Sequence, residues 1–203
     1  MEKGAVLPLF YLPNVEFFKN LQQFKDLTLL IEKQEHYPKQ TFRNRTSIAG
    51  PNGKLDLTVP VQKGSNAKRA FKDVKISYED QWQRIHWLSL ETSYRSSSYF
   101  EFYEDAFAPF YQKKYEFLFD YNIALLDVIL KLLKMPVTYN FTQTYEAAHV
   151  DFIDLRSVFT PKKESDYQNK PYYQAFEDRN GKLNNISIVD LLFNQGPQAA
   201  KFF

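Results

Sequence analysis

The chain has 203 residues, no cysteine and a formal net charge of only +2. The absence of cysteine excludes a disulfide scaffold, a thiol nucleophile and a thiolate metal site. Hydrophobic residues make up 44% and charged residues 25% of the sequence, which excludes wholesale disorder and fits a single domain over residues 1–203. Aromatic residues, at 17%, are unusually frequent, and many tyrosines are free to line a ligand cleft.

The N-terminus lacks the apolar stretch of a signal peptide, and no segment approaches the roughly 20 apolar residues that span a membrane. We therefore expect a cytoplasmic protein without a membrane span. The chain contains no GxSxG, Walker or GxGxxG motif, and its histidines, His36, His86 and His149, are far apart. The sequence therefore predicts neither a metal site nor a cofactor.

Positive charge is concentrated in one window, residues 39–75. This window holds nine Lys or Arg residues and two Asp residues, a balance of +7, which leaves −5 for the rest of the chain. Such asymmetry points to an anionic partner, such as a phosphate, a nucleotide or a nucleic acid. The alternative is a basic face that water or the acidic remainder of the domain neutralises.

The beginning of the chain predicts a βαβ unit. Residues 5–12 form a mostly apolar run that ends at Pro13, which is typical of a buried strand. Asn14 is a plausible N-cap for a helix over residues 15–24, and residues 27–32 return to strand character. Strand, helix and strand within about thirty residues favour two parallel strands.

A β-hairpin is the clearest local signal. Residues 40–49 and 54–62 flank a turn at residues 50–53, whose Asn-Gly pair favours a primed turn. Alternation in the two arms predicts an open face made by Arg43, Arg45, Ser47, Asp56 and Thr58. The opposite face of the hairpin is predicted to be apolar except for Asn44.

The middle of the chain is predicted to be helical. Ser77, Ser98 and Asp120 are candidate N-caps of three successive helices. The first helix would place Trp82, Ile85, Leu88 and Ser93 along its apolar stripe.

A strand over residues 138–145 follows, and Ser187 and Gly196 bound a short C-terminal helix. We expect an α+β fold. The βαβ unit and the hairpin would form one mixed sheet, packed by the helical middle region.

His86 is the candidate acid–base group. On its predicted helix it lies one turn beyond Trp82 on the same side, and an indole beside an imidazole can move its pKa into the range useful for proton transfer. The alternative is a core histidine that donates one hydrogen bond to a backbone carbonyl.

Arg43 and Arg45 are candidate ligand-binding residues, because guanidinium groups bind phosphates and carboxylates through paired hydrogen bonds. An exposed sheet face with local ion pairs is the alternative. Lys63 lies where the hairpin ends and a loop opens, a common place for ligand groups. Glu35 and His36 follow the second strand, where ligands of α/β sheets tend to bind.

Several segments together resemble the WbqC-like family of bacteria. They are Tyr11-Leu12-Pro13, residues 35–45 with their Asn44-Arg45 pair, residues 57–64, Trp82 with His86-Trp87, Tyr94, and Tyr99-Phe100-Glu101. The tail, residues 186–194, is similar to the Bacteroidetes-type branch. The chain departs from the family at Pro8-Leu9, where many members carry a Gln-Pro pair.

The resemblance implies a transferase of bacterial surface-polysaccharide (O-antigen) biosynthesis that moves an aminoacyl (glycine) or acyl group to a nucleotide-linked sugar. Its ligand site would be built by Arg43, Asn44, Arg45 and Lys63, with Glu35 and His36 nearby, Tyr94 or Tyr99 positioning the acceptor and His86 as general base.

Under this hypothesis, Arg43 or Arg45, Lys63 and His86 face one pocket. The alternative is a non-catalytic module that binds an anion or a nucleic acid through residues 39–75. Nucleic acid is the less favoured partner, because no aromatic RNA-binding motif is present.

Overall fold

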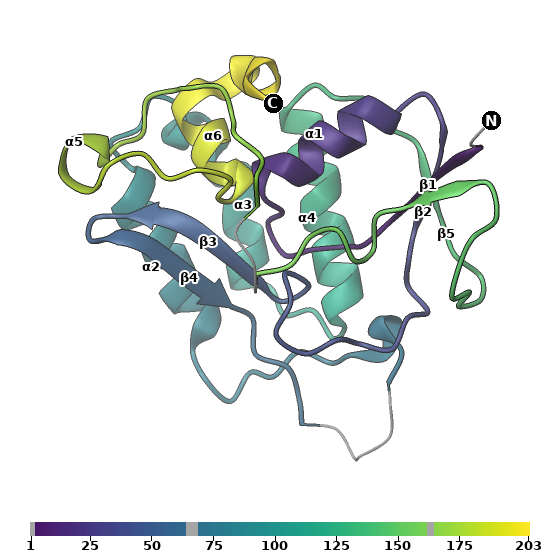
Figure 1. Cartoon of the computed structure of the whole chain (residues 1–203). Coiled ribbons are helices and arrows are strands. Elements are labelled where there is room, and N and C mark those ends of the chain that lie inside the picture. Colours follow the sequence, from purple (N-terminus) through teal and green to yellow (C-terminus); the bar gives the residue numbers. More distant parts are fainter. Residues whose placement is uncertain (1–2, 64–68, 162–164) are drawn as a thin grey trace.

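The protein has a parallel sheet and, apart from it, a hairpin (Figure 1). The computed structural model describes residues 3–63, 69–161 and 165–203. The strands of the parallel sheet, in spatial order, are β5 (Tyr139–Phe141), β2 (Thr28–Ile31), β1 (Gly4–Leu7) and β6 (Phe152–Asp154). The hairpin consists of β3 (Arg45–Gly50) and β4 (Gly53–Thr58).

The predicted βαβ unit is confirmed. Strand β1, helix α1 (Val15–Phe24) and strand β2 follow one another, and the two strands pair in parallel with Leu7 opposite Ile31. The side chain of Asn14 accepts a hydrogen bond from the Phe17 amide and caps α1, as expected. Strand β1 is shorter than predicted, because the chain turns before the helix, with Leu12 at a φ of 41°.

The α+β class is confirmed, but the hairpin does not join the parallel sheet. Its register agrees with the prediction, since Arg45 pairs with Thr58 and Ser47 with Asp56. Helices α2 (Trp82–Tyr94) and α6 (Ile188–Gln195) both contact β3. The inner face of the hairpin is therefore buried by helices, and the expected single mixed sheet is two sheets.

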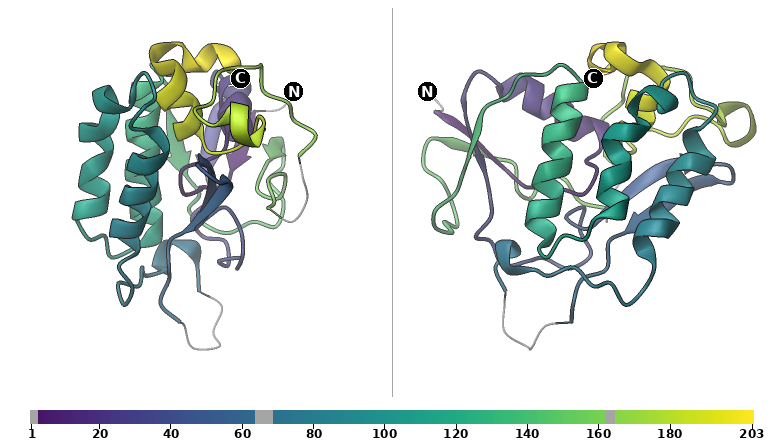
Figure 2. Two further views of the ribbon diagram at one scale, coloured as in Figure 1. Left: turned by 90° about the vertical axis from the view of Figure 1, so that its left-hand side faces the viewer. Right: turned by 180° about the vertical axis from the view of Figure 1, so that it is seen from behind.

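Three long helices, α2, α3 (Phe100–Gln112) and α4 (Leu118–Leu132), form a row on one side of the molecule (Figure 2). None of them has a side-chain N-cap, so the predicted caps at Ser77, Ser98 and Asp120 are wrong. Around Ser77 the chain is still extended, because its amide donates to the carbonyl of Pro60 at the end of the hairpin.

The C-terminal helix α6 is confirmed, capped by Ser187 and ended by Gly196. It contacts α1, α2, α3 and β3, and its residues from Ile188 to Asn194 are buried. The remaining elements are α5 (Glu177–Asn180) and the 3-10 turns Phe71–Asp73 and Gly196–Phe202. Within the described residues, no helix has the length and apolarity needed to cross a membrane.

Gly196 is expected to be essential for the end of α6. Its φ is 53°, and a Cβ at this position would overlap the ring of Tyr99. We expect Gly196→Ala to lower the free energy of unfolding by about 2 kcal/mol, through backbone strain and overpacking, as measured by urea unfolding.

Gly181→Ala is the matched control. Gly181 also has a positive φ, 72°, but an added Cβ would have no atom within 4 Å. Only backbone strain of about 1 kcal/mol is expected there. Equal losses in the two variants would contradict the role assigned to the Tyr99 contact.

Candidate functional site

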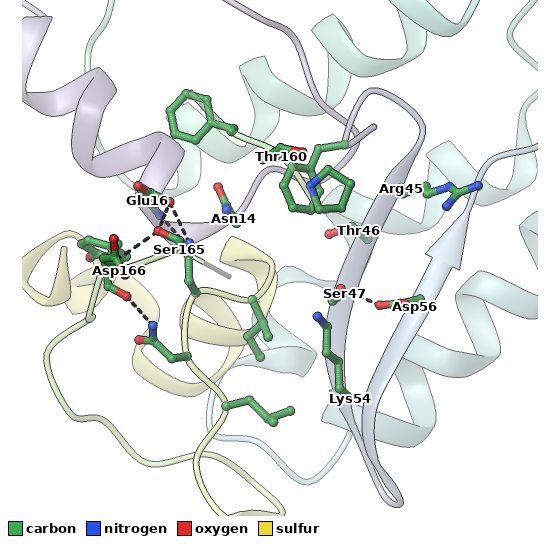
Figure 3. A pocket seen from close by; sticks show the side chains of 18 of the residues that line it. Asn14, Glu16, Arg45, Thr46, Ser47, Lys54, Asp56, Thr160, Ser165 and Asp166 are labelled. Atoms are coloured by element: carbon green, nitrogen blue, oxygen red, sulfur yellow. Dashed lines mark hydrogen bonds between the residues drawn. The ribbon is translucent and has the colours of Figure 1, made fainter. Parts of the chain in front are cut away.

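A cavity of about 720 Å³ lies between the hairpin, the beginning of α1 and two segments that follow β6 (Figure 3). Its volume is within the range of pockets that bind small molecules. The two segments are residues 158–168 and residues 182–186, of which 162–164 lie outside the described part of the chain. Most of its lining side chains are polar or charged, and Phe42, Phe159 and Tyr167 add aromatic surface.

The hairpin wall of the cavity carries two cations and one carboxylate, while Lys182 and Asp166 also line the cavity on its other side. Arg45, Ser47, Lys54 and Asp56 all line the cavity and share one face in the observed register. The hydroxyl of Ser47 donates a hydrogen bond of 2.6 Å to Asp56. The predicted open face of the hairpin is therefore the wall of a cavity.

Two cations on this wall have no carboxylate partner among the residues that the structure describes. The Nε of Arg45 is buried and has no hydrogen-bond partner among the described residues. Neither Arg45 nor Lys54 forms an ion pair with a carboxylate in the described residues. Because a buried donor without a partner is costly, Arg45 is suited to binding an anion.

The opposite wall carries a fixed carboxylate. Oε2 of Glu16, the second residue of α1, accepts hydrogen bonds from Ser165 Oγ at 2.7 Å and from Asn185 Nδ2 at 2.8 Å. The amide of Glu16 in turn donates to Asn185 Oδ1 at 3.0 Å. These contacts hold the Glu16 side chain in one orientation.

His86 lies in the core and does not line this cavity. Its Nδ1 is 2.9 Å from the hydroxyl oxygen of Tyr11, which is 3.0 Å from that of Tyr111. The ring contact with Trp82 is present as predicted, with centroids 5.2 Å apart. Burial lowers the pKa of His86 to about 4, so the ring is neutral near pH 7. A general base here would require a ligand that reaches the core.

Arg43 does not share the open face with Arg45. Strand β3 begins only at Arg45, so the alternation of the strand does not extend back to Arg43. The buried Arg43 donates Nε to Glu35 Oε1 at 2.6 Å and Nη2 to Glu35 Oε2 at 2.7 Å. Burial raises the pKa of the Glu35 carboxyl, and the guanidinium opposes that rise. Each charge satisfies the other, which is how proteins retain buried charges.

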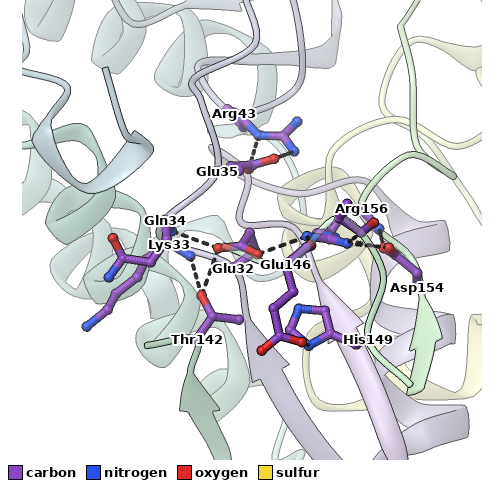
Figure 4. Close-up of polar contacts among 11 residues, drawn as sticks. Glu32, Lys33, Gln34, Glu35, Arg43, Thr142, Glu146, His149, Asp154 and Arg156 are labelled. Atoms are coloured by element: carbon purple, nitrogen blue, oxygen red, sulfur yellow. Dashed lines mark hydrogen bonds and ion pairs between the residues drawn. The ribbon is translucent and has the colours of Figure 1, made fainter. Parts of the chain in front are cut away.

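A second charged cluster lies at the carboxyl ends of the parallel strands (Figure 4). The fully buried Glu32 accepts hydrogen bonds from Arg156 Nη1 at 3.0 Å and from Thr142 Oγ1 at 2.7 Å. Arg156 also binds Asp154 at 2.5 Å. These groups satisfy one another and fasten the segment after β6 to β2.

The other predicted site residues are dispersed. Asn44 is buried and donates Nδ2 to the carbonyl of Val59 at 2.8 Å. Lys63 and His36 are exposed, and residues 64–68, which follow Lys63, lie outside the described part of the chain. The buried hydroxyl of Tyr94 accepts a hydrogen bond from the Ala49 amide, and Tyr99 packs against Gly196.

Of the nine predicted residues, Arg45 alone lines the cavity. The expected convergence of Arg43 or Arg45, Lys63 and His86 on one pocket is not observed there, because Arg43 and His86 are buried elsewhere. In the part of the chain that the structure describes, no three His, Asp or Glu side chains gather to hold a metal ion.

Several cations of the basic window are engaged within the protein. Arg43 is paired with Glu35, and Lys75 lies 2.7 Å from Glu116. Arg69 donates to the carbonyl of Gln62. The described part of residues 39–75 therefore presents less free charge than its composition indicates.

Comparison with known proteins places the chain in a family. The sequence model of the WbqC-like protein family matches residues 10–158. The chain belongs to this family. It is also similar to "Uncharacterized protein Rv1507c" of Mycobacterium tuberculosis, with 25% identity over 228 residues, covering 100% of this chain and 97% of that protein. No solved structure matches the chain.

The family match includes both the hairpin wall and the beginning of α1. Residues 165–186, which supply the donors to Glu16, lie beyond it. The tail at residues 186–194 also lies beyond it, so the resemblance to one branch of the WbqC-like family stays a prediction.

Sequence reasoning missed the carboxylate wall of this WbqC-like protein. Glu16 lies in the first turn of α1, where an acidic residue is ordinarily explained by its favourable interaction with the helix dipole. Its donors Ser165 and Asn185 are 149 and 169 residues away in sequence. Lys54 could have been found, because the alternation that places Asp56 on the open face also places Lys54 there.

The lowered pKa of His86 predicts that the protein loses stability in acid. The unfolded chain protonates His86 near pH 6.5, but the folded protein does so only near pH 4, so the unfolded state binds more protons between these values. Stability therefore falls as the pH drops from 6.5 to 4. We expect His86→Gln to remove about 3 kcal/mol of this loss, as measured by urea unfolding at pH 7 and pH 4.

His36→Gln is the control, because His36 is exposed and lies outside the core cluster. The difference in unfolding free energy between pH 7 and pH 4 should be the same in His36→Gln as in the wild-type protein. If His86→Gln also follows the wild type, the burial effect assigned to His86 is absent.

Proposed function

We propose that this WbqC-like protein is a transferase that binds a nucleotide-linked sugar in the cavity between the hairpin and α1. The observation that carries the proposal is the division of charge in this cavity of about 720 Å³. Arg45 and Lys54, which have no carboxylate partner among the described residues, lie on the hairpin side, and a fixed carboxylate with its amide and hydroxyl partners lies on the α1 side (Figure 3).

The cations suit the phosphates of such a ligand. A guanidinium group presents parallel donors to phosphate oxygens, and an ammonium group adds a point charge. Arg45 and Lys54 supply one of each on the same face of the hairpin. We assign the diphosphate of the ligand to these two side chains.

The remaining lining residues suit a base and a sugar. Phe42, Phe159 and Tyr167 offer aromatic faces on which a planar base or the apolar face of a sugar ring can pack. Polar side chains, such as Asn14, are the groups that fix ligand orientation in pockets.

The transferase class is supported by the family. The resemblance to WbqC-like proteins implies surface-polysaccharide biosynthesis, with an aminoacyl (glycine) or acyl group as the group transferred. His86 is buried and neutral and does not line the cavity, so the proposal gives it a place in the core and no catalytic role. A nucleic-acid-binding module is less well supported, because Arg43 and Lys75 of the basic window are paired internally.

The test is a thermal-shift and calorimetric screen with UDP-glucose, GDP-mannose and dTDP-glucose. We expect at least one to raise the melting temperature and Arg45→Gln to weaken its binding about tenfold or more, the loss expected when a hydrogen bond to a charged group is removed. Arg69→Gln is the control, because Arg69 lies in the same basic window and does not line the cavity.

Two results would refute the proposal. One is the failure of every nucleotide-linked sugar to stabilise the folded wild-type protein. The other is equal affinity in Arg45→Gln and Arg69→Gln, since that would place the ligand away from the hairpin wall.

A further inference from the structure

We propose that Glu16 binds the sugar ring of the ligand, with its Oε1 accepting a hydrogen bond from a sugar hydroxyl. This inference rests on the proposed function and adds to it the orientation of the ligand. The sugar would lie at the α1 end of the cavity and the diphosphate at the hairpin end.

The two carboxylate oxygens of Glu16 differ in their surroundings. Oε2 is occupied, because it accepts hydrogen bonds from Ser165 and from Asn185. Oε1 has no hydrogen-bond partner among the described residues, and the Glu16 side chain lines the cavity. Neither donor is a cation, and one oriented acceptor of the carboxylate remains for a ligand.

Glu16 is not required to cap its own helix. The side chain of Asn14 accepts from the Phe17 amide, and Asn185 Oδ1 accepts from the Glu16 amide. The Glu16 and Phe17 amides, which lie in the first turn of α1 and lack a carbonyl partner within the helix, are thus satisfied by the side chains of Asn185 and Asn14. The carboxylate is therefore available for a role in the cavity.

The charge of the opposite wall sets the direction of the ligand. A diphosphate is attracted to Arg45 and Lys54 and repelled by the carboxylate of Glu16. Sugar hydroxyls carry donors that suit a carboxylate, and a nucleoside diphosphate without its sugar lacks them at that end. Loss of the Glu16 carboxylate should therefore weaken the binding of nucleotide-linked sugars and should not weaken the binding of free nucleoside diphosphates.

Glu16→Gln tests this inference with little change in shape. To keep the hydrogen bonds from Ser165 and Asn185, the new amide must direct its oxygen at them and its NH₂ group into the cavity. The acceptor offered to the sugar then becomes a donor. Binding is measured by calorimetry with matched pairs: UDP-glucose and UDP, GDP-mannose and GDP, and dTDP-glucose and dTDP.

For the pairs that bind the wild-type protein, we expect Glu16→Gln to weaken the nucleotide-linked sugar about tenfold or more. The free diphosphate should bind as tightly as before or more tightly, because the repulsion by the Glu16 charge is removed. Glu16→Asp keeps the charge but withdraws it, and should give a smaller loss in the same direction. Binding of the diphosphate that is retained or tightened also shows that the variant is folded.

Glu101→Gln is the matched control, because Glu101 is likewise the second residue of a helix, α3, but is exposed and does not line the cavity. It should bind both ligands like the wild type. If Glu16→Gln weakens both members of a pair equally, or neither, Glu16 does not bind the sugar, although the proposed function stands. If no nucleotide-linked sugar binds the wild-type protein, both proposals fail.

Discussion

Two hydroxyl groups donate to the same carbonyl, that of Leu12, and the rest of the structure depends on this junction. Thr46 Oγ1 of β3 lies 2.8 Å from it, and Ser187 Oγ, at the beginning of α6, lies 3.0 Å from it. The Ser187 amide donates to the carbonyl of Ser47, and the Ile188 amide to that of Pro13. Three distant parts of the chain, the βαβ unit, the hairpin and the C-terminal helix, are therefore fixed to one another.

The cavity exists because of this junction. Three of its walls are the beginning of α1, the open face of β3 and β4, and the segment before α6, and each of these begins next to one of the joined residues. Since the joining groups are buried and hydrogen-bonded, the walls are held without a ligand. A preformed cavity reduces the ordering cost that binding would otherwise carry.

Charged side chains that form buried ion pairs stabilise the fold, whereas those without a partner among the described residues are available to a ligand. Glu32 and Arg156, like Glu35 and Arg43, are paired, and their loss would leave an uncompensated buried charge. Arg45 differs from Arg43 by two positions in sequence, yet its Nε has no partner among the described residues. The difference arises because β3 begins between them, so that one guanidinium turns to the core and the other to the cavity.

Sequence reasoning succeeded where the determinants were local. The Asn14 and Ser187 caps, the βαβ unit and the register of the hairpin all follow from residues within a few positions of each other. It failed where distant segments decide the outcome. The hairpin lies apart from the sheet because helices bury its inner face, and Ile85, expected inside, is 57% exposed.

The same distinction explains the candidate site. Arg45 could be predicted, because alternation along one strand is local, whereas the fixed orientation of Glu16 needs donors from Ser165 and Asn185, beyond the matched part of the WbqC-like family. The cations and the carboxylate come from within the family match, and the side chains that orient the carboxylate come from outside it. A relative that keeps Glu16 but lacks these donors would hold the carboxylate less rigidly. The proposed phosphate binding on the hairpin and the proposed sugar selection beside α1 could therefore change independently, because different parts of the chain would control them.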